Sequence, residues 1–121
     1  MSKSATSVFV FALYLFVLGV TLLVVPNILL GLFGIPATAD VWIRVVGMLV
    51  TILGYYYLQA ARTGFKAFFR ATIYGRTSVL LFFIAFVLFR LAPPVLILFG
   101  VIDVAGAIWT ALCLKAESEA G

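Results

Sequence analysis

Four long apolar stretches, separated by short polar or proline-containing segments, make up most of the chain. They cover residues 8–25, 41–61, 71–91 and 94–114, and each is long enough as a helix to cross a hydrocarbon layer of about 30 Å. A shorter apolar segment, residues 26–34, begins with Pro26 and ends with Gly34, residue types favoured at the first turn of a helix and just beyond its last turn. The pattern predicts an all-α fold: a bundle of four transmembrane helices, with a short interfacial helix after the first span.

The connections between the stretches are short. Residues 62–70 carry three basic side chains and a glycine, and we expect them to form a loop. Pro93 and Pro94 mark a tight turn before the last span, because proline restricts the residue before it and opens helices well. The polar tail, residues 115–121, is expected to fray.

Composition places this fold in a membrane. Of the 121 residues, 66% are hydrophobic and only 10% are charged, whereas about a quarter of the residues of a soluble domain are charged. The length suits a single transmembrane domain, residues 1–121. Residues 8–25 could also be a cleaved signal peptide, but the basic segment ahead of them is weak and no small-residue cleavage site precedes Pro26. A first transmembrane helix is the better interpretation.

The basic residues indicate an orientation. One set of helix ends carries Lys3, Arg62, Lys66, Arg70 and Lys115, and the other carries Arg44 and Arg90. Because Lys and Arg concentrate on the cytoplasmic side, we expect both termini in the cytoplasm, with the protein spanning the plasma membrane several times. The net charge of +4 then indicates anionic lipid headgroups as partners of Arg62, Lys66 and Arg70, rather than nucleic acid.

Asp103 is the acidic residue deep inside an apolar stretch. An ionised carboxylate at the bilayer centre costs about 2.5–3.5 kcal/mol, so it is expected to find a partner. Arg44, Arg76 and Arg90 are the candidates, and a helical rise of about 1.5 Å per residue puts Arg44 and Arg76 within reach of Asp103 if the helices shift. Three interpretations stay open: an ion pair or hydrogen bond that fixes helix register, a site that binds a ligand or carries a proton, and a contact with lipid or another subunit. Snorkelling to the outer headgroups is an alternative for Arg44 and Arg90.

Small residues recur on one face of two of the predicted helices. They are Gly47, Thr51 and Gly54 in the second span, and Gly100 and Ala107 in the fourth. Helices in lipid associate through small residues that let their backbones approach closely. These positions are therefore the predicted helix-packing residues, and they make the second and fourth helices the inner pair.

Catalytic chemistry finds little support in the sequence. The chain has no histidine and one cysteine, Cys113, so histidine chemistry, an intramolecular disulfide and paired-cysteine metal sites are excluded within one chain. We expect no enzymatic activity, no catalytic residue, no metal site and no cofactor.

Several segments in the first half of the chain resemble a known group. They are Pro26 with Leu-Phe-Gly-Ile-Pro at residues 32–36, Trp-Ile-Arg-Val-Val-Gly at 42–47, Leu-Gly-Tyr-Tyr at 53–56 and Ala-Ala-Arg at 60–62. Together they cover about a third of the chain, and they resemble the uncharacterised bacterial four-helix inner-membrane proteins of the DoxX-like and BphX-like type. The resemblance implies a four-helix membrane bundle without established catalytic residues.

Three functions are compatible with these features. The leading hypothesis is a non-enzymatic accessory or scaffold subunit of a larger membrane complex or a homo-oligomer. The second is a small oligomeric transporter or channel that uses Asp103 with Arg44 or Arg76. The third is a membrane protein that binds lipid or a quinone.

Overall fold

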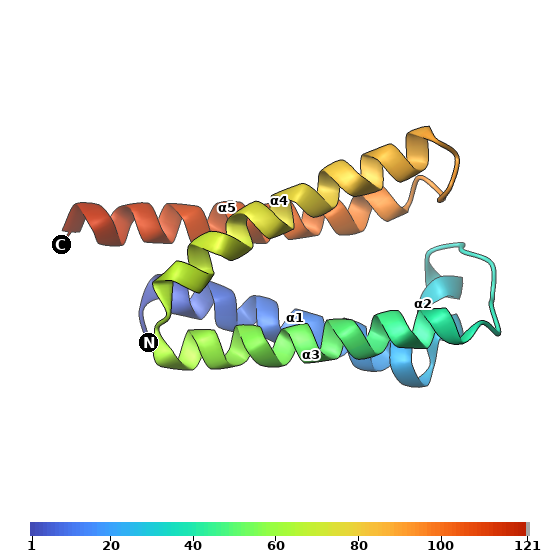
Figure 1. Ribbon diagram of the computed structural model, residues 1–121, viewed down its shortest axis with the longest axis horizontal. Helices are drawn as coiled ribbons and strands as arrows, with labels where there is room; N and C mark the ends of the chain where they lie inside the picture. The colour runs from blue at the N-terminus through green and yellow to red at the C-terminus, as the bar shows by residue number, and fades with distance from the viewer. Residues whose placement is uncertain (121) are drawn as a thin grey trace. The chain divides into compact units, whose positions relative to one another are not determined.

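The computed structural model describes residues 1–120, which form helices and connections without any strand (Figure 1). The helices are α1 (Lys3–Val24), α2 (Pro26–Leu32), α3 (Val41–Thr63), α4 (Lys66–Leu88) and α5 (Leu96–Ala120). In this part of the chain, α1, α3, α4 and α5 are long and apolar enough to cross a membrane. The predicted all-α fold with four candidate spans is confirmed, as is the short helix after the first of them.

The predicted loop at residues 62–70 is wrong, because α3 and α4 are separated only by Gly64 and Phe65. Gly64 has a φ of +67°, and two hydrogen bonds close the end of α3: the Phe65 N–H donates to Ala60 O and the Gly64 N–H to Ala61 O. This pair of bonds is a Schellman motif, which stops one helix and lets the next begin at once. The early start of α4 includes Phe69, which is fully buried.

The start of α1 and both ends of α5 also differ from the prediction. The first helix begins at Lys3 rather than near residue 8, since Ser2 Oγ accepts a hydrogen bond from the Ala5 N–H and caps it. The last helix begins at Leu96, after turns at Pro93 and Pro94. It continues to Ala120, so the expected fraying of the tail is wrong for residues 115–120; Gly121 lies outside the described residues.

Two other helices end in the same motif as α3. After α2, Gly34 has a φ of +71°, and the N–H groups of Gly34 and Ile35 bond back to Gly31 and Leu30. After α4, the equivalent residue is Arg90, with a φ of +59°. The left-handed conformation costs a residue with a Cβ about 1–2 kcal/mol, so the end of α4 is strained where the other two are not.

Contacts divide the chain into two compact units. Unit 2 is residues 9–59, and its main feature is the antiparallel pair of α1 and α3. Gly19 of α1 and Gly47 of α3 face each other so closely that a Cβ at either position would meet backbone atoms of the other helix at 2.5–2.9 Å. The two backbones therefore touch at this crossing, as expected for close helix packing in lipid.

Unit 1 is residues 1–8 together with 60–120. Its main feature is the antiparallel pair of α4 and α5, which lie side by side (Figure 1). Gly100 of α5 sits against Leu80 of α4, where an added Cβ would be 3.0 Å from the Leu80 Cα. The first turns of α1 also belong to this unit, and they contact the last turns of α5.

Candidate functional site

Unit 1 contains a connected set of polar side chains, which we call the polar network. Its members come from the start of α1, the first half of α4 and the second half of α5: Ser4, Ser7, Lys66, Thr72, Arg76, Thr110 and Glu117. All of them except Lys66 and Glu117 are buried. Burying hydroxyls and a charge away from water is costly unless each finds a partner, so the geometry of this network determines its role.

Arg76 lies at the inner end of the polar network, with only 2% of its surface exposed. Its Nη2 donates to Thr72 Oγ1 at 2.9 Å and to Thr110 Oγ1 at 3.0 Å, and its Nε donates to Thr72 O at 3.3 Å. Thr72 and Arg76 are one helical turn apart on α4, and Thr110 reaches them from α5. The guanidinium thus joins the two helices through hydroxyl groups.

The hydroxyls continue the network from Thr110 to α1. Ser7 Oγ lies 2.8 Å from Thr110 Oγ1, and it donates to Ser4 O at 2.7 Å. Because a hydroxyl has one hydrogen, Ser7 must accept from Thr110, which accepts in turn from Arg76. The hydrogen bonds from Arg76 to Thr110, from Thr110 to Ser7 and from Ser7 to Ser4 O therefore point in one direction, from Arg76 to the first turn of α1.

Glu117 connects the same turn of α1 to α4. Its Oε1 accepts from the Ser4 N–H at 2.9 Å, its Oε2 accepts from Ser4 Oγ at 2.7 Å, and Lys66 Nζ lies 3.1 Å from Oε2. The first N–H groups of a helix have no partner in their own helix, and the positive end of the helix dipole favours a carboxylate there. Glu117 therefore acts as a cap for α1 that is supplied by α5.

The stability contributed by Glu117 is expected to depend on pH. Glu117 lies beyond the apolar stretch of α5, which ends at residue 114, and the hydrogen bonds from Ser4, followed by Lys66, hold the pKa of its carboxyl below its ordinary value. A lowered pKa in the folded state stabilises the protein above the ordinary value of 4.5 and loses that effect as the pH falls toward about 2. Thermal unfolding of the detergent-solubilised protein should show a falling midpoint over this range. A Glu117→Gln variant should lack this part of the pH dependence, and an identical pH profile in both proteins would contradict the assignment.

Asp103 is half-buried on α5, on the stripe that continues through Thr110 and Glu117 at intervals of seven residues. It lies close enough to Arg76 for the two charges to interact. The polar contacts described for Arg76 nevertheless go to threonine oxygens. An Asp103–Arg76 ion pair stays a prediction.

The other two predicted partners of Asp103 lie at helix ends. In unit 2, Arg44 Nη1 donates to Leu23 O at 2.6 Å and to Val24 O at 3.2 Å. These are the last carbonyls of α1, and the last carbonyls of a helix have no partner within their own helix. Arg44 thus caps the end of α1, and Arg90 is the strained residue that ends α4.

The predicted packing residues lie at helix contacts. In unit 2, Gly47 and Gly54 of α3 face α1, and Thr51 Oγ1 donates to Gly47 O beside Gly19. In unit 1, Gly100 contacts Leu80, and Ala107 is 1% exposed.

The basic residues predicted to bind headgroups have different surroundings. Lys66 pairs with Glu117, while Arg62 and Arg70 are exposed. These three predicted contacts are therefore not equivalent.

Sequence reasoning did not select Ser4, Ser7, Thr72 or Glu117 as site residues. The available signals were local spacings: Ser4 and Ser7 three apart, Thr72 and Arg76 four apart, and Glu117 seven residues after Thr110. Such spacings show that residues share a helix face, but they do not show which faces meet. Comparison of the chain with protein-family models, with curated proteins and with solved structures finds no match.

Proposed function

We propose that this protein is a non-enzymatic, multi-pass accessory or scaffold subunit of the bacterial inner membrane, acting in a homo-oligomer or a larger membrane complex. The observation that carries the proposal is that the polar network connects three helices of unit 1. Its buried charge, Arg76, joins α4 to α5 through threonine hydroxyls, and the hydroxyls extend that connection to α1. This is an arrangement that fixes helices in register and gives a rigid unit.

The outer surface of the spans also supports an interaction role. Large apolar side chains are exposed along α4 and α5, among them Leu81, Phe82, Leu88, Ile108 and Leu112. In a membrane such side chains face either lipid or other helices, and in lipid helix association depends on packing rather than on a hydrophobic driving force. A scaffold subunit presents surfaces of this kind while buried hydroxyls such as those of Ser7 and Thr110 bond within the unit.

The proposal includes the orientation of the protein in the membrane, with both ends of the chain on the cytoplasmic side. The contacts of Glu117 with Ser4 and Lys66 bring the start of α1, the start of α4 and the end of α5 to one end of unit 1. Lys3, Lys66 and Lys115 all lie within three residues of this junction along the chain. An end that collects basic residues is expected on the cytoplasmic side, so both ends of the chain lie there.

Native mass spectrometry tests the proposed function. The full-length protein is extracted with mild detergent from its own membranes, and the intact mass is measured before and after dilution of the extract. The expected result is a mass above that of one chain that survives dilution, from a homo-oligomer or from defined additional subunits. A mass of one chain under every extraction condition would refute the proposal.

A further inference from the structure

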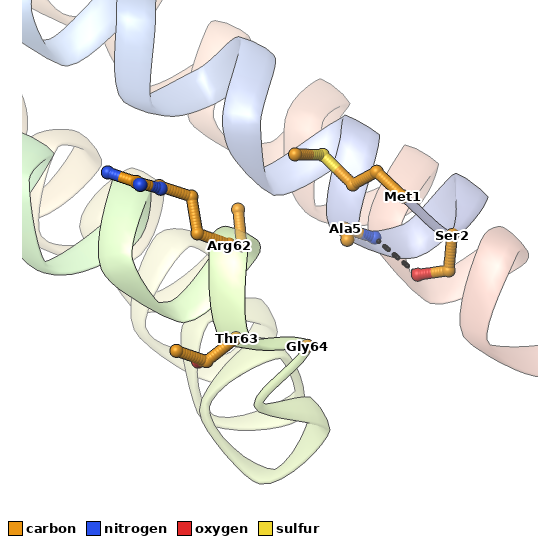
Figure 2. Close-up of a pocket in the computed structure, with 7 residues that line it drawn as sticks. Met1, Ser2, Ala5, Arg62, Thr63 and Gly64 are labelled. Atoms are coloured by element: carbon orange, nitrogen blue, oxygen red, sulfur yellow. Dashed lines mark hydrogen bonds between the residues drawn. The ribbon is translucent and has the colours of Figure 1, made fainter.

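An open hollow of about 490 Å³ lies in unit 1 between the start of α1 and the end of α3 (Figure 2). Met1, Ser2 and Ala5 border it on the α1 side, and Arg62, Thr63 and Gly64 on the other. Gly64 has no side chain to fill the hollow, and the space around its Cβ position is open, because no atom lies within 4 Å of it. The hollow is thus an accessible depression at the end of a membrane span.

The charge of the hollow is positive. None of its lining residues is acidic, and Arg62 supplies a full charge. Within residues 1–120, the Arg62 side chain makes no hydrogen bond or ion pair. Its neighbour Lys66, by contrast, is held by Glu117. Arg62 is therefore the basic group here whose donors are available to a ligand.

The position of the hollow indicates which anion it meets. Arg62 directly follows the apolar stretch of α3, so it lies at the level of the lipid headgroups when α3 spans the bilayer. A guanidinium presents paired N–H donors that match phosphate oxygens. The exposed side chain of Met1 adds an apolar group, which suits the glycerol and upper acyl chain beside a lipid phosphate.

We propose that this hollow binds one anionic phospholipid of the surrounding membrane, with the lipid phosphate on the Arg62 guanidinium. The proposal goes beyond the scaffold role and does not depend on it. It also divides the three predicted headgroup residues: Arg62 is the specific contact, Lys66 is committed to Glu117, and Arg70, which does not line the hollow, adds only a diffuse attraction.

The test uses the full-length protein reconstituted in vesicles of equal parts phosphatidylcholine and phosphatidylglycerol, followed by native mass spectrometry of the lipids that remain bound. We expect one phosphatidylglycerol to be retained in preference to phosphatidylcholine. Arg62→Gln should lower its retention about tenfold, as loss of a charge-assisted hydrogen bond predicts. The matched control is Arg70→Gln, which removes the same charge outside the hollow and should change retention by less than about twofold.

Three results would overturn the proposal. If Arg62→Gln and Arg70→Gln lower the retention of phosphatidylglycerol equally, the attraction is diffuse and electrostatic. If the protein shows no preference for phosphatidylglycerol over phosphatidylcholine, the hollow is not a site for an anionic lipid. Binding of inorganic phosphate to the solubilised protein with the same dependence on Arg62 would assign the hollow to a soluble anion. If Arg62→Gln does not fold, Arg62→Lys and Arg70→Lys decide: a larger loss in the first supports the site, and equal retention refutes it.

Discussion

Replacing Gly47 by alanine should lower the free energy of unfolding by about 1–3 kcal/mol, the usual cost of forcing a methyl group into a filled space. A Cβ at this position would lie 2.5 Å from the Leu23 N and 2.8 Å from the Gly19 O. Both are backbone atoms, which cannot rotate aside as a side chain could. The helices α1 and α3 must therefore separate, and unfolding by denaturant in mixed micelles, followed by circular dichroism, measures the loss.

Gly75 provides the matched control within the same chain. It also lies inside a long helix, α4, but no atom lies within 4 Å of its Cβ position. Gly75→Ala should be neutral or should stabilise by about 0.5–1 kcal/mol, because alanine favours the helix more than glycine does. Equal effects of the two substitutions would mean that helix propensity, and not the backbone contact, decides the stability of the α1–α3 pair.

Thr110→Val should be comparably harmful, with a loss of about 1.5–3 kcal/mol for a hydrogen bond to a charged group. The substitution keeps the volume of a fully buried side chain but removes the acceptor for Arg76 and the donor to Ser7. The same unfolding measurement applies. Thr21→Val is the control, since the Thr21 hydroxyl bonds only to Val17 O in its own helix and the change should stay within about 0.5 kcal/mol.

A double mutant makes this prediction sharper. Replacing both partners of a buried hydrogen bond by apolar groups costs less than orphaning one of them. Arg76→Met combined with Thr110→Val should therefore destabilise less than the sum of the two single variants. Strict additivity would show that the contact between the guanidinium and the threonine carries no energy.

The membrane spans could be predicted because length and apolar composition alone distinguish them. Their ends were less predictable, since they depend on caps that form in space. The basic residues around Gly64 suggest a loop, yet its positive φ ends α3 and lets α4 begin at Lys66. In the same way, nothing near Glu117 in the sequence shows that Ser4 will hold it and keep α5 helical to Ala120.

For a similar reason, the charged residues of the candidate site could be predicted from the sequence, but its hydroxyl residues could not. Asp103 and Arg76 stand out as charges in apolar stretches, and any reading of hydropathy selects them. Hydroxyl residues do not stand out, because in a membrane helix they satisfy themselves on their own backbone, as Thr21 and Ser78 do. Only the pairing of α4 with α5 distinguishes Thr110 from these, and that pairing is a property of the fold.

The bond between Ser4 and Glu117 joins residues 113 positions apart, which sets an order of events during synthesis. Because α5 is synthesised after α1, Ser4 has no carboxylate partner until the end of α5 has been made. Unit 1 closes only after the last residues of α5 leave the exit tunnel. A chain truncated just before Glu117 would thus keep the four apolar stretches and still lack the contact that closes unit 1.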